Sequence, residues 1–315
     1  MGYTVFIGDV ARDEYYSVER FPELGDKVAV EALPVQFGGA MANAASVYAS
    51  YGGETMFLSA LNPSDISLCE ELQKYNIDTS LVQFDQKLPE SKCMIFLSQG
   101  EHSVFIVSMA GSTVELTSDV QHILCNAEMI YSSYFELSRL RFGDLDGEEI
   151  VRQWHENGVK LVCDIDVDSI GEKARRFLPY TEILFMNKVG FKNLCGAKSE
   201  EEAIREIMGS GVKLLVVTLA EAGCAIYKED RKATIAGIKT EVVDVTGAGD
   251  TFCSTFAYSY LKLKDSFLAG QFAIYAASLS IKKMGARSGA VGVAPVINAM
   301  NSDKIDTTPY ESMFC

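Results

Sequence analysis

The sequence has few histidines, and its cysteines lack the spacing that metal sites and redox motifs require. It contains only three histidines, at positions 102, 122 and 155, and none of its eight cysteines forms a C-x-x-C pair. Zinc sites need histidines or cysteines at short, regular spacings, so we expect no zinc site. We interpret the cysteines as reduced residues, mostly of the core, in a cytoplasmic protein.

The sequence also lacks a long hydrophobic run. Apolar runs such as Leu214–Val217 have the length of a strand and fall far short of the roughly 20 residues of a membrane span. Asp9 interrupts the apolar stretch near the N-terminus and Arg12 follows it, which argues against a secretory signal. We therefore expect a cytoplasmic protein with no membrane partner.

Basic residues are outnumbered by acidic ones. The chain has 28 Lys and Arg against 43 Asp and Glu, a formal net charge of −15. Nucleic acids and anionic membranes are themselves negative, so neither is an expected partner. A small phosphate site stays open, because a few backbone amides can hold one anion. Apolar residues make up 48% of the 315 residues, which allows a large core and excludes global disorder.

Two phosphate-binding motifs are missing. The pattern G-x-x-x-x-G-K-[ST] does not occur, which excludes a P-loop protein. Gly247-x-Gly249 could begin a dinucleotide fingerprint, but that fingerprint needs a third small residue at the position of Phe252. If this segment binds a phosphate, it therefore does so through neither a P-loop nor a dinucleotide fingerprint.

The second half of the chain alternates short apolar runs with helical patterns. Buried strands between helices are typical of a parallel sheet covered on both faces. Neither a Pro/Ser-rich linker nor a repeat divides the sequence, so we expect one α/β domain over residues 1–315. Its predicted form is three layers, with a mostly parallel central sheet between helices. Strands are expected at 129–131, 159–164, 183–186 and 214–218, and helices at 147–157, 171–177 and 200–208.

Two stretches break this alternation. Residues 15–36 join strand-like pieces such as Val28–Val30 through prolines and a glycine, and residues 93–107 have the pattern of a hairpin with a polar turn. We expect a small antiparallel β-sheet, formed from about 12–36 and 90–110, that projects from the body. It would serve either as a lid over a cleft or as the contact of a homodimer.

The first of two glycine-rich segments starts at Gly38-Gly39 and continues with small residues to Ala49. A double glycine lets the backbone approach a ligand or turn sharply, because no Cβ intrudes. The small residues suit a helix packed closely on the sheet, with Asn43 one turn inside it. Asn43 can donate and accept hydrogen bonds, which suits a hydroxyl ligand; a tight turn with a solvated Asn43 is the alternative.

The second segment, Asp244–Phe252, leads into a helical pattern with one buried face. Gly247–Asp250 therefore lies at a helix N-terminus, where unpaired amides and the helix dipole attract an anion. The same helix end favours an ionised Asp250, and a general base beside a phosphate must be ionised. The alternative interpretation is that Asp250 only caps the helix. The residues of the buried face are Phe252, Phe256, Tyr260 and Leu263.

Together the two segments resemble the signatures of the ribokinase-like (PfkB) carbohydrate kinases. Gly38–Asn43 is similar to the first motif of that family, and Asp244–Phe252 to the second, D-T-x-G-A-G-D-x-F, in the expected order. The resemblance implies a ribokinase-like fold with a β lid. Weaker similarities extend it over nearly the whole chain, at Gly8–Asp13, Phe21–Asp26, Asn187, Thr218, Gly223 and Gly285-Ala286.

The resemblance implies a kinase that transfers the γ-phosphoryl group of ATP to a hydroxyl of a small sugar. Asp250 would be the general base, and the amides of Gly247, Ala248 and Gly249 would form an anion hole. No dense Lys and Arg cluster marks a sugar-phosphate site, so an unphosphorylated furanose or open-chain sugar is expected. Its hydroxyls would be held by Asp13, Gly38, Gly39, Asn43 and Asp9.

The same resemblance assigns the nucleotide side of the site. Mg²⁺ would bridge the phosphates of ATP, largely through water. Asp244 and Thr246 are similar to positions that contribute to a monovalent cation site, for example for K⁺, in some family members. The nucleotide would lie against Asn187, Thr218, Ala220 and Gly223.

One departure from the family pattern bears on the activity. The family motif N-x-x-E is Asn187–Gly190 here, so the Glu that helps to organise magnesium is missing. A sugar- or nucleotide-sensing homologue without catalysis is therefore one alternative. A nucleoside kinase is the other, in which Phe37, Tyr15 and Tyr16 would stack on the base.

Overall fold

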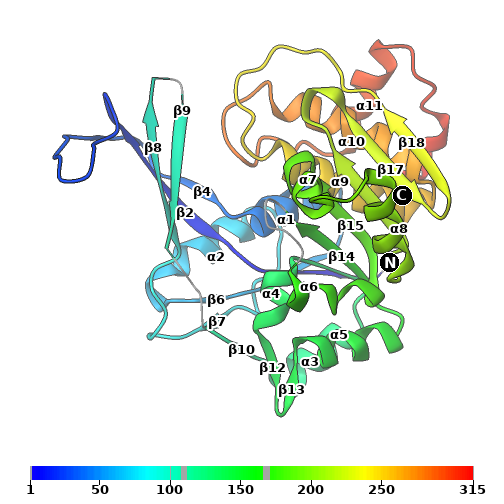
Figure 1. The fold of residues 1–315 in the computed structure, drawn as a ribbon, viewed down its shortest axis with the longest axis horizontal. Coiled ribbons are helices and arrows are strands. Elements are labelled where there is room, and N and C mark those ends of the chain that lie inside the picture. Colours follow the sequence, from blue (N-terminus) through cyan, green and yellow to red (C-terminus); the bar gives the residue numbers. More distant parts are fainter. Residues whose placement is uncertain (1, 100, 108–111, 166–170, 315) are drawn as a thin grey trace.

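A computed structural model describes residues 2–99, 101–107, 112–165 and 171–314. Within these ranges the body of the protein is an eight-stranded sheet with helices on both faces (Figure 1). Six neighbouring strands are parallel and an antiparallel hairpin forms one edge, which confirms the predicted three-layer α/β fold. In spatial order the strands are β18 (Arg231–Ile235), β17 (Cys224–Lys228), β16 (Leu214–Thr218), β15 (Thr181–Asn187), β14 (Lys160–Ile165), β11 (Met129–Ser132), β1 (Thr4–Ile7) and β5 (Thr55–Leu58).

The strands form where short apolar runs can be buried on both faces. In β1, Val5 and Ile7 join the core on one side of the sheet, and Phe6 joins the core on the other. This alternation follows the two-residue period of a strand. One helical layer contains α1 (Ala40–Ser50), α2 (Ile66–Gln73), α9 (Ala248–Leu263), α10 (Ser266–Ser280) and α11 (Val293–Ser302).

The other face of the sheet carries a second layer of helices. The predicted helix at 147–157 is α5 (Gly147–Glu156), with an Asp146 capping box at its start, and that at 200–208 is α8 (Glu200–Gly209). The helix expected at 171–177 is shorter, α6 (Glu172–Arg175). The same face also has α3 (Ser118–Cys125), α4 (Tyr134–Arg139) and α7 (Lys188–Cys195).

A second sheet projects from the body as an arm (Figure 1). Its central strand β2 (Ala11–Ser17) pairs with β3 (Glu31–Ala32) and β4 (Gln36–Gly38) on one side and with β8 (Lys92–Ser98) on the other, and β8 pairs with β9 (Glu101–Ile106). This is the predicted lid sheet. The predicted antiparallel pairing is wrong for β2 and β8, which are parallel. Both strands leave the body at one point, where Ser91 Oγ donates to Val10 O at 2.7 Å, so they run outwards together.

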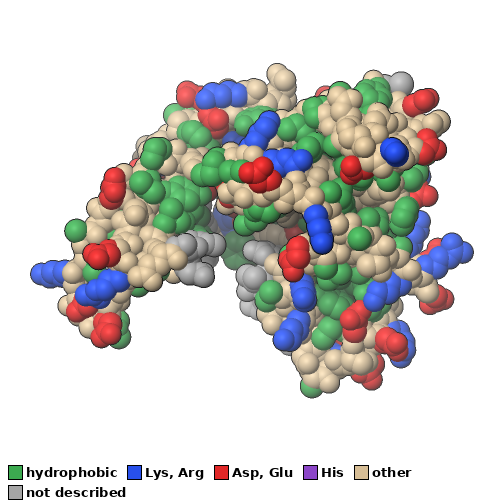
Figure 2. Space-filling view, turned by 90° about the horizontal axis from the view of Figure 1, so that it is seen from above, with side chains coloured by type: hydrophobic (Ala, Val, Ile, Leu, Met, Phe, Trp, Pro, Cys, Tyr) green, Lys and Arg blue, Asp and Glu red, His purple; other side chains and the backbone are tan. Residues whose placement is uncertain are grey.

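Figure 2 shows a hollow between this arm and the body. The range 28–30, expected as a strand, lies outside any strand, and residues 100 and 108–110 of the predicted lid segments lie outside the described residues. The single domain over 1–315 and the full extent of the lid stay predictions. The remaining short strands are β6 (Ala60–Leu61), β7 (Gln83–Phe84), β10 (Val114–Glu115), β12 (Leu140–Phe142) and β13 (Leu145–Asp146), and the 3-10 turns are Pro63–Asp65, Leu178–Tyr180, Ala220–Ala222 and Thr308–Phe314.

The helices of the described part of the chain are too short or too polar to cross a membrane.

Candidate functional site

The two glycine-rich segments meet in space. Asn43 Nδ2 donates to Asp250 Oδ2 at 2.8 Å, although the two residues are 207 positions apart. Asn43 is buried on α1, and Asp250 lies in the first turn of α9. The structure therefore brings the amide of the first segment directly against the carboxylate of the second.

The start of α1 requires glycine. Gly39 has φ 95°, and a Cβ there would lie 2.7 Å from Asp9 O and Val10 Cα. The first amides of the helix are satisfied by Asp9, because Ala40 N donates to Asp9 Oδ2 (3.0 Å) and Met41 N to Asp9 Oδ1 (3.3 Å). Asp9 thus holds α1 in place, with both carboxylate oxygens engaged.

Asp13 lies beside this turn, on β2. Its carboxylate is so close to Gly38 that a Cβ on Gly38 would lie 2.1 Å from Asp13 Oδ2. Burial raises the pKa of Asp13 to about 6; a hydrogen bond from the Cys93 thiol opposes this rise and the charge of Asp9 adds to it. Asp13, Gly38 and Asn43 therefore border one small region next to Asp250.

The turn before α9 is held by a second aspartate. Asp244 accepts hydrogen bonds from Thr246 N and Gly285 N, both at 2.9 Å. Burial raises the pKa of Asp244, but these hydrogen bonds outweigh it and lower the pKa below its ordinary value. Gly247 has φ 74°, and a Cβ there would lie 2.0 Å from Ala286 O.

The amides at the start of α9 differ in availability. Ala248 N donates to Val245 O at 3.1 Å, so this amide is already engaged. Gly249 is exposed in the first turn, where amides have no partner within the helix. Of the predicted anion hole, Gly249 is thus better placed than Ala248 to meet an anion.

The residues predicted for the nucleotide lie at the ends of two adjacent strands. Asn187 and Thr218 are register partners at the carboxyl ends of β15 and β16. Asn187 Oδ1 accepts from Gly190 N at 2.7 Å and so caps α7. Gly223 has φ 100°, and a Cβ there would lie 2.0 Å from Ile235 O. Ala220 has φ 53°, a conformation that a Cβ strains.

Asp164 is not among the site residues that the sequence predicts. It stands near the carboxyl end of β14, where it accepts hydrogen bonds from Tyr131 Oη (3.0 Å) and from the thiol of Cys253 on α9. Burial raises the pKa of Tyr131, and the charges of Asp164 and Asp250 raise it further. Asp164 and Asp250 therefore lie near the same hydroxyl. The predicted strand end at Asp164 was the available signal, because carboxyl ends of parallel strands carry binding sites.

Glu136 is a further buried carboxyl, and it lies near Gly8 and Met41 at the start of α1. Arg139 Nη1 donates to Glu136 Oε2 at 2.6 Å, and both side chains are 10% exposed. Burial raises the pKa of Glu136 to about 7; Arg139 opposes the rise and Asp9 adds to it.

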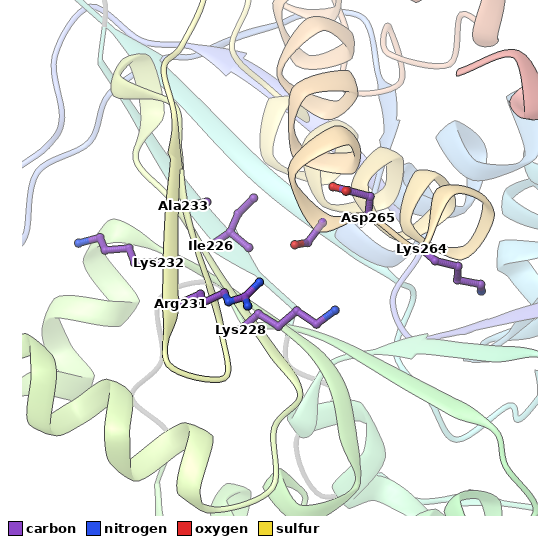
Figure 3. A pocket seen from close by; sticks show the side chains of 8 residues that line it. Ile226, Lys228, Arg231, Lys232, Ala233, Lys264 and Asp265 are labelled. Atoms are coloured by element: carbon purple, nitrogen blue, oxygen red, sulfur yellow. The ribbon is translucent and has the colours of Figure 1, made fainter. Parts of the chain in front are cut away.

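A cavity of about 320 Å³ lies elsewhere, between the β17–β18 hairpin and the α9–α10 loop (Figure 3). Lys228 and Arg231 border it, but Lys228 already lies over the Tyr260 ring. The loop follows the C-terminal end of the 16-residue α9, so it is about 24 Å from the turn with Asp250. This cavity does not belong to the site.

The fold and the paired Asn43–Asp250 site define a ribokinase-like protein. The chain belongs to the pfkB family of carbohydrate kinases, whose sequence pattern matches residues 1–291. Within the described ranges, no group of three or more His, Cys, Asp and Glu side chains could hold a metal ion by itself.

Two curated relatives and one solved structure illustrate the similarity. The bifunctional ribokinase/ribose-5-phosphate isomerase A of Fructilactobacillus sanfranciscensis is 24% identical over 98% of this chain, which spans 58% of that relative's length. The nucleoside kinase of Methanocaldococcus jannaschii is 24% identical over 95% of this chain and 97% of its own. A ribokinase of Arabidopsis thaliana, solved with ribose and ATP, has a TM-score of 0.81 at 22% identity, covering 95% of this chain and 98% of its own.

Proposed function

We propose that this protein is an ATP-dependent kinase that phosphorylates a hydroxyl of a small sugar, with an unphosphorylated furanose or open-chain sugar as substrate. The observation that carries the proposal is the 2.8 Å contact between Asn43 and Asp250 at the N-terminus of α9. It supports the proposal because an amide that can bind a hydroxyl and a carboxylate that can act as a base lie together beside a helix end that attracts anions.

Asp250 is the proposed general base. It removes the proton from the substrate hydroxyl while that oxygen attacks the γ-phosphorus of ATP and the bond to the β-phosphate oxygen breaks. It lies in the first turn of α9, where the helix dipole favours a negatively charged side chain. Gly247, Ala248 and Gly249 are the proposed anion hole for the transferred group. The Ala248 amide would have to leave Val245 O to take part.

Asp13, Gly38, Gly39 and Asn43 are the proposed sugar-binding residues. Gly38 lets the Asp13 carboxylate lie directly against the backbone, where a Cβ would be only 2.1 Å from Asp13 Oδ2, and Asp13 supplies acceptors for hydroxyl protons. Asp9 is the weakest candidate, because both of its oxygens already accept amides of α1.

ATP is the proposed phosphoryl donor, bound along Asn187, Thr218, Ala220 and Gly223. Magnesium, when bound, would neutralise phosphate charge. Asp164 fits as its carboxylate, since Mg²⁺ in such sites takes one or two carboxylates together with substrate phosphates.

A monovalent cation such as K⁺ is proposed beside Asp244 and Thr246. Each oxygen of Asp244 accepts one backbone amide, and the carboxylate also accepts the Thr246 hydroxyl, which leaves about one of its roughly four acceptor positions for a cation.

The test is ADP release with Mg²⁺ and ATP across a panel of sugars and nucleosides. A sugar that turns over well above the nucleosides supports the proposal. The nucleoside kinase alternative is favoured by the M. jannaschii relative, which is as similar as the ribokinase one. A nucleoside as the best substrate would establish it, and binding without turnover would establish the sensing alternative that Gly190 suggests.

A homodimer through the lid is a further part of the proposal. On β9, the edge strand of the arm, Val104, Phe105 and Ile106 are exposed by 47%, 52% and 74%. Exposed apolar residues on an unpaired strand edge favour pairing with a second chain. Sedimentation should give the mass of two chains, and Ile106→Lys should shift it towards one.

A further inference from the structure

Arg287 is a buried arginine that the proposed chemistry does not use. It is 9% exposed, and its Nη1 atom has no hydrogen-bond partner among the described residues. Burying a cation with an unpaired donor is unfavourable for folding. Its place in the fold therefore calls for a reason other than stability.

The guanidinium reaches the proposed sugar-binding segment with two donors. Arg287 Nε donates to Asn43 Oδ1 at 3.3 Å, and Nη2 donates to Gly38 O at 3.2 Å. The group thus joins the turn at Gly38 to the side chain of Asn43. On its other side the guanidinium lies 5.9 Å from the centre of the Tyr75 ring, which limits its movement.

The chemistry of the three groups fixes the orientation of the Asn43 amide. A guanidinium only donates hydrogen bonds, and an ionised carboxylate only accepts them. Asn43 must therefore turn Oδ1 to Arg287 and Nδ2 to Asp250, as observed. A flipped amide would face donor with donor and acceptor with acceptor. The second proton on Nδ2 is then left for an oxygen of the substrate.

The segment that carries Arg287 also supports the start of α9. Gly285 N donates to Asp244 Oδ2 at 2.9 Å, and a Cβ on Gly289 would lie 2.1 Å from Thr251 Oγ1. Both contacts are with the turn and helix that carry Asp250. Residues 285–289 therefore lie against the start of α9 on one side and reach the proposed sugar-binding amide of Asn43 on the other.

We propose that Arg287 is a positioning residue, which holds the Asn43 amide with its nitrogen towards Asp250 and the acceptor hydroxyl. The proposal rests on the proposed function, because Asn43 and Asp250 are its sugar-binding residue and base. It adds a role for a residue outside both glycine-rich segments.

The test is a double-mutant cycle on kcat/KM with the best sugar of the panel. Arg287→Met alone should lower kcat/KM by about 10- to 100-fold, mainly through kcat, because the base and hydroxyl lose their alignment. In an Asn43→Ala background, Arg287→Met should cost no more than about threefold, because the residue it acts through is absent. Losses that multiply would overturn the proposal, since they would show that Arg287 acts independently of Asn43.

Ser288→Ala is the matched control, because it removes a hydrogen bond of the same segment, Ser288 Oγ to Ser280 O, without touching Asn43. It should keep kcat/KM within about twofold of wild type, a much smaller change than the loss of about 10- to 100-fold expected when the base and the hydroxyl are misaligned. If Arg287→Met does not fold, Arg287→Lys replaces it, since lysine keeps the buried charge and loses the two-donor contact.

A second measurement does not depend on turnover. In ¹⁵N-labelled protein, the side-chain NH₂ of Asn43 should exchange at least about tenfold faster in Arg287→Met than in wild type, because its orientation is released. Equal exchange rates would overturn the positioning role. Absence of turnover on every sugar would instead defeat the proposed function, and the exchange rates would still decide the role of Arg287.

Discussion

Asp13→Asn should change the dependence of stability on pH. Burial raises the pKa of the Asp13 carboxyl from 3.8 to about 6 in the folded protein. Below pH 3.8 the carboxyl is protonated in both states, and above pH 6 it is ionised in both. Between these values the folded protein keeps the proton that the unfolded chain releases, so the contribution of Asp13 to stability is lost as the pH rises.

The size of the effect follows from the two pKa values. Their difference corresponds to about 3 kcal/mol at 1.36 kcal/mol per pKa step, and partial solvent contact makes about 2 to 3 kcal/mol the expected range. Unfolding of 315 residues at about 2.1 cal/mol/K per residue has an entropy of roughly 0.66 kcal/mol/K. The melting temperature of Asp13→Asn should therefore gain about 3 to 5 °C on that of wild type between pH 4 and pH 7.

Calorimetric melting of both proteins from pH 4 to 7.5 at constant ionic strength measures this gain. Any fixed cost of packing the amide cancels, because only the change of the difference with pH matters. Asp144→Asn, in the exposed turn between β12 and β13, is the control and should show a flat difference. A flat difference for Asp13→Asn as well would refute the burial of an ionisable carboxyl at this position.

Three further substitutions test the site and its turns. Asp250→Asn should lower kcat by about 10²- to 10⁴-fold and leave sugar binding in place, because only the base is lost. Steady-state kinetics measure kcat and calorimetric titration measures sugar binding. Near-normal turnover would contradict the role proposed for Asp250. Ala220→Gly should stabilise the fold by about 0.5 to 1 kcal/mol in urea unfolding, since φ 53° strains a Cβ, and a loss of stability would exclude such strain. Gly223→Ala should destabilise by more than about 2 kcal/mol, because its Cβ would lie 2.0 Å from Ile235 O, and an unchanged unfolding midpoint would show that the turn relaxes freely.

Elements with a local signal could be predicted from the sequence. The strand expected at 159–164 is β14 at Lys160–Ile165, because a short apolar run bounded by polar residues can be buried only as a strand here. The turns at Gly39 and Gly247 could also be predicted, because glycines with small neighbours mark a turn in the sequence. In the structure both glycines have positive φ. Each of these features depends on neighbours in the sequence.

Features that depend on distant partners could not be predicted. The parallel pairing of β2 with β8 joins Arg12 to Lys92 and depends on where both strands leave the body. Arg287 carries no motif, and its contact with Asn43 arises only in the folded chain. Asp164 lies at a predicted strand end, but its contacts with Tyr131 and Cys253 could not be predicted. Polar residues that act through tertiary contacts leave no periodic signal in the chain.

The electrostatics of the site agree with the proposed use of ATP and an uncharged sugar by an acidic protein. On the sugar side, the carboxyls of Asp13 and Glu136 are buried and have raised pKa values, while Arg139 and Arg287 already bond to Glu136 and to Asn43. A sugar phosphate would bring about two negative charges against these carboxylates, with both arginines engaged. On the nucleotide side, the positive end of α9 attracts the phosphate that is transferred. This separation of charge is therefore consistent with the proposed binding of ATP phosphates at α9 and of neutral hydroxyls beside Asp13.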